Sequence, residues 1–251
     1  MTKIIALHSF RGGTGKSNVT ANTAYLLAQA GNKIGIIDTD IQSPGIHVIF
    51  NLTEKQVKNT LNDFLWGNCA IEEAAYRVEL PGLPADGQVY LVPSSIKAND
   101  IARVLRDRYD PNALNDGFRD LIAAHDLDYL LIDSHPGLNE ETLLSIAISD
   151  ALIIVLRPDQ QDFQGTHVTV EVARRLKVPE IMLVVNKVPP DYDFADVKRK
   201  VEQAYNCQVA TLLPLSMDVA HTASSQIFCI QEPEHPFSQG VAELAHRLIE
   251  L

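Results

Sequence analysis

A glycine-rich segment near the start of the chain constrains its fold more than any other feature. Residues 10–17 read Phe-Arg-Gly-Gly-Thr-Gly-Lys-Ser, directly after an apolar run (4–7) and directly before a helix-like stretch. Glycines let the backbone curl so that its N–H groups face phosphate oxygens, and the N-terminus of the next helix favours an anion. Lys16 is placed to reach the β- and γ-phosphates of a nucleotide, and Ser17 to offer its hydroxyl to Mg²⁺. An ordinary glycine-rich turn is the alternative, but the strand–loop–helix context favours a nucleotide triphosphate site.

The same segment departs from the standard phosphate loop, which has glycine where this chain has Phe10. Residues 12–17 (Gly-Gly-Thr-Gly-Lys-Ser) resemble the deviant loop of the ParA/MinD family of ATPases instead. In that family a signature lysine before the double glycine reaches across a dimer interface to the partner's phosphates, and this chain has Arg11 there. An arginine keeps the charge but is a planar fork, so either Arg11 makes the cross-dimer contact or another cation does. In lacking the signature lysine, the chain resembles the McdA type of the family, which spaces carboxysomes along the nucleoid.

Two further strand ends match the family in order and spacing. Asp38 opens the run Asp-Thr-Asp after the apolar residues 34–37, and it resembles the family aspartate that helps to orient attacking water and Mg²⁺. Asp133 follows the apolar residues 129–132 and resembles the Walker B carboxylate, which faces Mg²⁺ through water. Taken alone, each aspartate would more commonly be a helix N-cap or a turn residue. Together with the loop, the resemblance implies a metal site formed by Ser17, Asp38 and Asp133.

A third strand end, Asn186-Lys187, indicates which base is bound. GTPases usually continue this pair to an aspartate two places later, which accepts hydrogen bonds from guanine, and here that place is Pro189. Without that acceptor adenine is favoured over guanine. The alternative is that this dipeptide simply ends a buried strand before a proline turn. Its position favours base contact by Asn186.

Short continuous apolar runs alternate with helix-like stretches along the whole chain. This pattern predicts a doubly wound, mostly parallel seven-stranded sheet with helices on both faces, the α/β fold of P-loop NTPases, with ligands at the carboxyl ends of the strands. The expected strands are 4–7, 34–37, 89–92, 129–132, 152–156, 181–185 and 209–213. The expected helices are 17–30, 59–66, 100–124, 140–148, 163–176, 193–205 and 237–249. No linker or repeat is visible, so a single P-loop ATPase domain over 1–251 is expected.

Composition agrees with this fold and excludes several classes of protein. A hydrophobic content of 46% with 21% charged residues is ordinary globular usage, not that of a disordered chain. The net charge of −11 argues against a dominant electrostatic grip on DNA or anionic lipid. Cys69, Cys207 and Cys229 are far apart and lack CxxC spacing, so they indicate buried thiols in a reducing cytosol. Without a signal-like N-terminus or a membrane-length apolar run, a cytoplasmic location is expected.

Other basic residues bear on partners. Arg157 and Lys97 each follow a predicted strand, and they are candidates for the contact to the partner subunit's phosphates, although a solvated side chain or a structural ion pair is commoner for either alone. The basic runs at 174–177 and 198–200 lie where ParA-like relatives hold DNA without reading its sequence, although most such runs are solvated helix faces. The amphipathic C-terminal stretch 241–251 carries two glutamates against one arginine, which does not suit an anionic bilayer. We interpret it as a helix packed on the domain.

The resemblance therefore implies a slow, ATP-dependent, dimerising ATPase that positions or partitions intracellular cargo. It implies homodimerisation around ATP and Mg²⁺, a cargo adaptor, non-specific DNA as a further partner, and nucleoid association. Lys16, Asp38 and Arg11 would be catalytic. The residues that would bind the cofactor are Arg11, Gly12, Gly13, Thr14, Gly15, Lys16, Ser17, Asn18, Asn186 and Pro214. Two alternatives remain, an ATP-driven metallocentre assembly factor, whose cysteine pair is not visible here, and a nucleotide-binding adaptor without hydrolysis.

Overall fold

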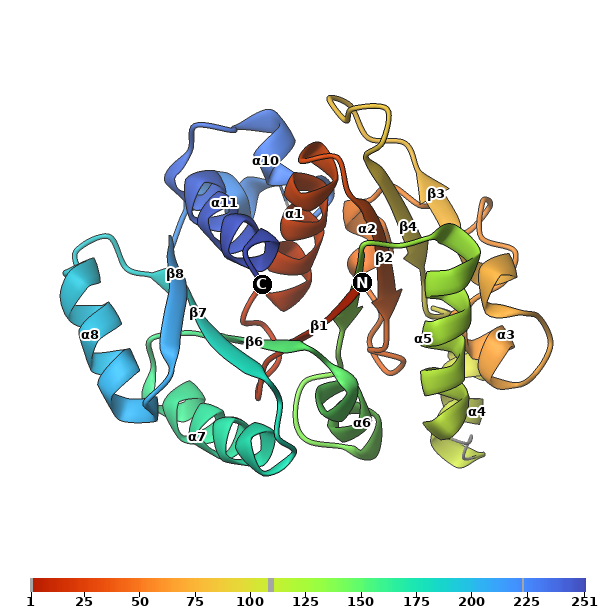
Figure 1. Ribbon diagram of the computed structural model, residues 1–251, viewed down its shortest axis with the longest axis horizontal. Helices are drawn as coiled ribbons and strands as arrows, with labels where there is room; N and C mark the ends of the chain where they lie inside the picture. Colours follow the sequence, from red (N-terminus) through yellow and green to blue (C-terminus); the bar gives the residue numbers. More distant parts are fainter. Residues whose placement is uncertain (1, 108–110, 223) are drawn as a thin grey trace.

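A central sheet of eight strands organises the computed structural model, which describes residues 2–107, 111–222 and 224–251 (Figure 1). The strands lie in the order β3-β4-β2-β5-β1-β6-β7-β8, and every neighbouring pair is parallel except β3 with β4. In chain order they are β1 (Lys3–His8), β2 (Lys33–Asp38), β3 (Tyr76–Val78), β4 (Gln88–Val92), β5 (Tyr129–Asp133), β6 (Ala151–Leu156), β7 (Glu180–Val188) and β8 (Gln208–Pro214). The α/β architecture predicted from the sequence is confirmed.

The prediction of seven strands is wrong by one, because it omits β3 at the edge of the sheet. This strand is three residues long, has Arg77 at its centre, and pairs antiparallel with β4. A run that short carries no recognisable apolar period, and it becomes a strand only because β4 offers it a free edge. The seven strands that were predicted are all present.

Three strands at the centre of the sheet bring the predicted site residues to one edge. β5 lies between β1 and β2, and in the register of these pairs Asp133 stands beside both Leu7 and Asp38. The glycine-rich loop leaves β1 immediately after His8. Because parallel strands present their carboxyl ends at the same edge, the loop and both aspartates meet there.

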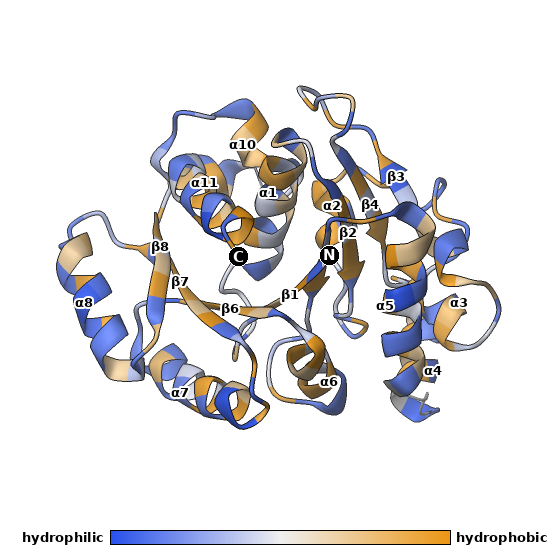
Figure 2. Cartoon of the chain, in the orientation of Figure 1, coloured by the Kyte–Doolittle hydropathy of each residue, from blue (hydrophilic) through white to orange (hydrophobic). Residues whose placement is uncertain are grey.

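The helices cover both faces of the sheet. On one face pack α1 (Lys16–Gln29), α10 (Phe228–Gln231) and α11 (Pro236–Ile249), and on the other α5 (Pro111–His125), α6 (Glu140–Ile148), α7 (Gln160–Arg175) and α8 (Phe194–Tyr205) (Figure 1). The strands are largely apolar, whereas these helices are apolar toward the sheet and polar outside (Figure 2). Successive residues of β1 serve opposite faces: Leu7 belongs to the core under α1, and Ala6 to the core under α7. The remaining helical turns are α2 (Ile46–Ile49), α3 (Leu61–Leu65), η1 (Ile71–Ala74), α4 (Ala98–Arg106) and α9 (Met217–His221).

The single helix expected over 100–124 is wrong, because the chain forms two helices there. α4 ends at Arg106, Asp107 is extended, and α5 begins at Pro111, while residues 108–110 lie outside the described part of the chain. Proline suits the first position of a helix and disrupts an interior, which accounts for a new start at Pro111.

The C-terminal helix lies on the body of the protein, as expected. α11 packs against α1 and β8 and buries Val241, Leu244 and Leu248. No helix among the described residues has both the length and the apolar character needed to cross a membrane. The extent of a single domain over 1–251 stays a prediction.

Candidate functional site

The loop between β1 and α1 has the backbone of an anion cradle. Gly13 and Gly15 adopt positive φ angles of 79° and 91°, which side chains disfavour. A Cβ on Gly15 would also stand 2.4 Å from Nδ2 of Asn186. The N–H groups from Gly13 to Ser17 donate no hydrogen bond to another backbone group of the described residues. Thr14 Oγ1 is likewise buried without a partner in that part of the chain. These free donors fit a phosphate-bearing nucleotide.

Beneath the loop, Asp133 collects three side chains of α1. Its Oδ1 accepts from Lys16 Nζ at 2.7 Å and from Thr20 Oγ1 at 2.9 Å, and its Oδ2 accepts from Ser17 Oγ at 2.7 Å. Lys16 is 6% exposed and Asp133 is 1% exposed, so each charge compensates the other away from water. Thr20 was not predicted from the sequence. Its position four residues after Lys16, one helical turn along the same face, was the available signal.

Asp38 lies beside this cluster and is fully buried. Its two carboxylate oxygens accept from the backbone N–H groups of Asp40, at 3.0 Å, and Gly45, at 3.2 Å. Burial, followed by repulsion from Asp133, raises the pKa of Asp38 to about 8. Two carboxylates, Asp38 and Asp133, share one buried cation here, so a second cation would fit the site. Mg²⁺ is suited to it, because it prefers oxygen ligands such as those of Ser17 and Asp133.

A further contact, not predicted from the sequence, joins the loops that follow β2 and β5. His135 Nδ1 donates to Asp40 Oδ1 at 2.6 Å, and Ser43 donates to the same oxygen through its N–H and its hydroxyl. Burial disfavours the charged form of Asp40, but the hydrogen bond and charge of His135 outweigh it and hold the pKa of Asp40 below its usual value. Asp40 and His135 therefore fasten two loops at the rim of the site.

Two adjoining cavities lie along the loop. The first, about 270 Å³, is lined by the loop together with Asp38, Asp40 and Asp133. The second, about 230 Å³, is lined by Asn186, Pro214 and neighbouring residues of the segment after β8. The residues Gly15, Asn18 and Ser224 line both cavities. A charged phosphate end next to a more apolar pocket is the arrangement that a nucleotide requires.

Asn186 performs a task in the protein itself. Its Nδ2 donates to the Thr14 carbonyl at 2.8 Å, and its Oδ1 accepts from the N–H of Lys187 at 2.8 Å. Lys187 Nζ donates to the Gly13 carbonyl at 2.8 Å. The Asn186-Lys187 pair thus fastens the phosphate loop from below. Contact between Asn186 and a base stays a prediction.

The three cations considered for the cross-dimer contact have different surroundings. Arg11 lies in the loop and donates to the amide oxygen of Gln161, and it has no ion pair among the described residues. Arg157 is held by two carboxylates of its own chain, Asp162 at 3.0 Å and Asp159 at 3.2 Å. Lys97 lines neither cavity beside the loop.

The basic runs and the cysteines are spread over the surface and the core. Arg199 and Lys200 both pair with Asp196, and Arg174 pairs with Glu171, so part of each basic run is neutralised.

All three cysteines are free thiols, with Cys229 buried in the core. The described residues contain no group of three His, Cys, Asp or Glu side chains arranged to hold a metal.

Comparisons with known proteins point the same way. The family model described as "AAA domain" (AAA_31) matches residues 2–182. An uncharacterized ATP-binding protein of Methanocaldococcus jannaschii is 30% identical over 99% of this chain and 88% of its own length. The flagellum site-determining protein of Helicobacter pylori is 28% identical over 99% of this chain and 82% of its own. An iron–sulfur cluster carrier protein of Pseudomonas fragi is 26% identical over 96% of this chain and 83% of its own.

Solved structures share the fold. The septum site-determining protein MinD of Pyrococcus horikoshii, in complex with Mg-ADP, superposes with a TM-score of 0.82 at 22% identity, covering 99% of this chain and 96% of the other. The McdA protein of Cyanothece, an Asp→Ala variant in complex with ATP, superposes with a TM-score of 0.80 at 17% identity, covering 100% of this chain and 97% of the other. At these identities the likeness concerns the fold alone.

Proposed function

Because the chain belongs to the AAA domain family, as a ParA/MinD-like P-loop protein, we propose that it is an ATP-dependent, dimerising ATPase that positions or partitions intracellular cargo. The cargo class is a plasmid, a chromosome or an organelle such as a carboxysome. The observation that carries the proposal is the cluster in which Asp133 holds both Lys16 and Ser17 under a glycine loop with free N–H groups.

ATP with Mg²⁺ is the proposed ligand. The N–H groups of residues 12–18 and the Lys16 ammonium would hold the phosphates, with Ser17, Asp38 and Asp133 near the metal. Asn18, Asn186 and Pro214 line the second cavity, where the base would lie. When bound, Mg²⁺ would supply positive charge that offsets the negative charge of the phosphates.

Slow hydrolysis is the proposed reaction, and Asp38 is the proposed group that holds the attacking water. Two N–H groups fix its oxygens at the wall of the phosphate cavity, so the carboxylate does not need to reorganise. Lys16 would keep its charge on the phosphates while Asp133 holds it in place. Arg11 of the partner subunit would add positive charge at the same phosphates.

Dimerisation around ATP completes the proposal, and Arg11 is the preferred cross-dimer cation. In the described part of the chain the Arg11 guanidinium contacts only the neutral Gln161, whereas moving Arg157 would leave the buried carboxylate of Asp162 without its cation. Because the Asp162 side chain is only 2% exposed, losing this cation is unfavourable, and Arg157 is held in its own chain. Arg11 can leave its partner at much smaller cost.

Light scattering with ATP tests this step. The Asp38→Ala protein, which should retain ATP, is expected to form a dimer, and adding Arg11→Ala should return it to monomer while ATP still binds. Arg119→Ala, which removes an exposed arginine of α5 outside the site, is the matched control and should leave the dimer intact. Dimerisation is expected at roughly tens of micromolar protein. If the ATP-loaded Asp38→Ala protein stays monomeric there, the result contradicts the dimerising ATPase and favours the non-hydrolysing adaptor.

The proposed partners are a cargo adaptor and non-specific DNA, at a cytoplasmic or nucleoid-associated location. DNA binding would use Arg175, Lys177 and Lys198, the members of the two basic runs that have no ion pair among the described residues; Arg175 and Lys177 are exposed and Lys198 is half-buried. Such binding would fall steeply with added salt, because it would depend on phosphate contacts. Membrane association is not part of the proposal.

A metallocentre assembly factor is the second candidate, favoured by the similarity to an iron–sulfur cluster carrier protein. Cys69 and Cys207 are half-buried and would be the thiols within reach of a second subunit. Iron or zinc bound stoichiometrically to the ATP-loaded dimer, and lost in Cys69→Ser or Cys207→Ser, would support this candidate over cargo positioning.

A further inference from the structure

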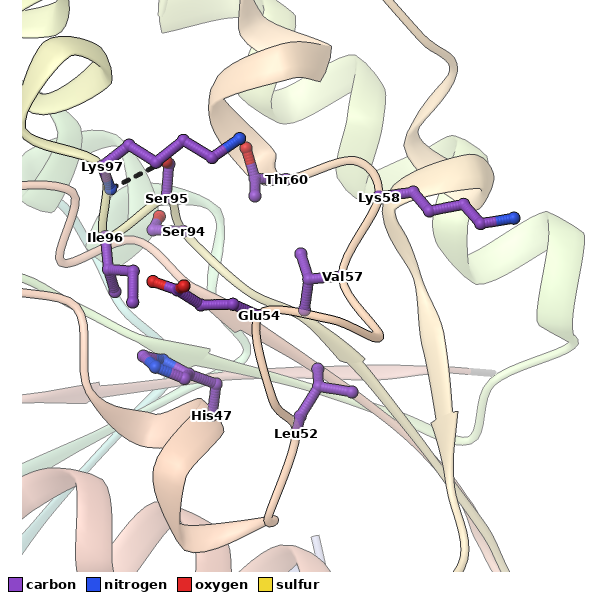
Figure 3. Close-up of a pocket in the computed structure, with 10 residues that line it drawn as sticks. All are labelled: His47, Leu52, Glu54, Val57, Lys58, Thr60, Ser94, Ser95, Ile96 and Lys97. Atoms are coloured by element: carbon purple, nitrogen blue, oxygen red, sulfur yellow. Dashed lines mark hydrogen bonds between the residues drawn. The ribbon is translucent and has the colours of Figure 1, made fainter.

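A small apolar cavity lies behind the nucleotide site and belongs to neither of the two cavities beside the phosphate loop. It measures about 40 Å³ and lies between α2, the segment 52–60 and the loop after β4 (Figure 3). Since a water-sized group needs about 10–15 Å³ on this scale, the cavity holds roughly three such groups, the size of a valine or leucine side chain. Its apolar wall consists of Leu52, Val57 and Ile96, and Ile96 is 41% exposed.

Among the buried side-chain polar atoms that line the cavity, one nitrogen lacks a partner in the described part of the chain. Ser94 Oγ donates to the Asp38 carbonyl at 2.7 Å, Ser95 Oγ to Asp100 at 2.6 Å, and Thr60 Oγ1 to Asp63 at 2.8 Å. His47 is 9% exposed, and its Nδ1 has no partner among the described residues. Burial lowers the pKa of His47, so its ring is neutral at pH 7 and has a free lone pair or a free N–H according to the tautomer.

The carboxylate of Glu54, which lines the cavity, favours a cationic occupant. Figure 3 shows the Glu54 side chain reaching over the His47 ring toward Ile96, and Glu54 has no ion pair in the described part of the chain. Lys58 points away from the cavity, and Lys97 extends along its upper edge toward Thr60. Lys58 and Lys97 line the cavity as well, and of these three charged groups Figure 3 places only that of Glu54 between His47 and Ile96. The net charge of −11 draws a basic partner to the protein from a distance.

The wall of this cavity is also a wall of the phosphate cavity. The short helix α2 places His47 in the apolar cavity and Ile49 in the phosphate cavity. The residue before it, Gly45, donates to the carboxylate of Asp38, whose carbonyl accepts from Ser94. A partner seated here would therefore contact α2 and Ser94, which adjoin Asp38 through these hydrogen bonds.

We propose that this cavity is a docking site for a short adaptor segment that presents an aliphatic side chain next to a basic one. The aliphatic group fills the space beside Ile96, the basic group pairs with Glu54, and a backbone group of the segment meets His47 Nδ1. The inference rests on the proposed function in that it gives the chemistry of the cargo adaptor.

Binding of a defined probe tests the proposal. The acetylated, amidated peptide Gly-Lys-Leu-Arg-Gly is titrated to millimolar concentration while the amide signals of the whole protein are followed by NMR. We expect saturable shifts at residues 47, 54 and 94–97. Affinity should fall about threefold or more when the peptide leucine is replaced by serine, and likewise when its basic residues are replaced by glutamate.

Variants of the protein sharpen the test. Glu54→Gln and Ile96→Ser should each weaken the probe about threefold or more, whereas Asp86→Asn, an exposed carboxylate outside the cavity, should not. Equal binding by the glutamate peptide, or an unchanged affinity in both cavity variants, would overturn the proposal. Shifts of the same amides on concentrating the protein alone would assign the cavity to a second copy of the chain and overturn it too.

The readout separates this inference from the proposed function. Peptide binding is measured without nucleotide, and the Lys16→Ala protein should bind the probe like the wild type. A protein that hydrolyses ATP and dimerises but leaves the probe unbound contradicts the docking site alone. A protein that binds the probe but neither dimerises nor hydrolyses ATP contradicts the ATPase proposal alone.

Discussion

The two ends of the proposed nucleotide cleft are built in different ways. At the phosphate end, buried side chains from one helix converge on Asp133, and two strands set their aspartates side by side. At the other end, the wall after β8 is a surface segment in which Leu215 is 51% and Met217 is 67% exposed. The helix α9 of that segment contains no buried residue. Buried, mutually paired groups are rigid, whereas exposed segments with few packed contacts open at low free energy.

The difference corresponds to what each end has to recognise. Phosphates are charged and bind through fixed positive charges and N–H groups, which act best when they are held in place before the ligand arrives. A base is largely apolar, and a surface segment can adjust to it after the phosphates are bound. We therefore expect substitutions at the phosphate end to have much larger effects than those at the base end.

The largest effect is expected for Lys16→Ala. Loss of the ammonium that faces the β- and γ-phosphates should abolish measurable ATP binding, a fall of roughly 10² or more in affinity. The same change leaves Asp133 buried without its cation, so thermal stability should fall as well. Calorimetric titration of Lys16→Ala/Asp133→Asn separates the two effects, because the neutral pair should recover stability but not ATP. Binding restored in the double variant would show that the phosphate end senses folding rather than charge.

The next effect is expected on turnover. Asp38→Ala should retain ATP and lose hydrolysis by about 10² or more, since the loop still cradles phosphate while the group that orients water is gone. The measurement is phosphate release at saturating ATP, with Asp86→Asn as a control for a carboxylate outside the site. Unchanged turnover would transfer the role to Asp40 or Asp133.

A smaller effect concerns the stability of the phosphate end toward acid. His8 is completely buried and donates to Ser134 Oγ, and burial, with the nearby positive charge of Lys16, lowers its pKa from 6.5 to about 3. Below pH 6.5, His8 is therefore protonated in the unfolded chain but stays neutral in the folded chain. His8 should therefore contribute full stability above pH 6.5 and lose about 1.4 kcal/mol for each pH unit below it, down to about pH 3.

Urea unfolding at pH 7 and pH 5 measures this contribution. The wild type should lose about 2 kcal/mol more than His8→Asn over that interval, if the unfolded histidine has its ordinary pKa. Parallel losses in the two proteins would assign the acid sensitivity to other groups.

The smallest effects are expected at the base end. ATP should bind about tenfold or more better than GTP, because Pro189 stands where an acceptor for guanine would be. Met217→Ser should change ATP affinity less than about twofold, because the Met217 side chain is 67% exposed and does not line the second cavity. Equal affinities for the two nucleotides would remove the base assignment, and a large effect of Met217→Ser would show that the exposed segment closes on the ligand.

Local patterns in the sequence were enough to predict the loop at 10–17 and the strand ends at Asp38 and Asp133. Each is a short run in which glycine, lysine or aspartate stands beside apolar strand residues, and such runs keep their meaning without knowledge of the rest of the chain. The same patterns predicted seven strands, helices on both faces and the packed C-terminal helix. They could not predict β3 or the break at Asp107, because an edge strand depends on its neighbour and a helix end on tertiary context.

What the side chains of the site touch was decided by the tertiary structure. Asn186 meets Thr14 across 172 residues, and His135 meets Asp40 across 95. Such contacts depend on which strands become neighbours in the sheet, and no local period reports that. The sequence offers both Arg11 and Arg157 for the cross-dimer contact, yet only folding places two carboxylates beside Arg157 and a neutral amide beside Arg11. The sequence by itself predicted the α/β fold and a nucleotide as the ligand, because the motifs behind both predictions depend on local residue type, while packing decided which charges are bound and which remain free to act.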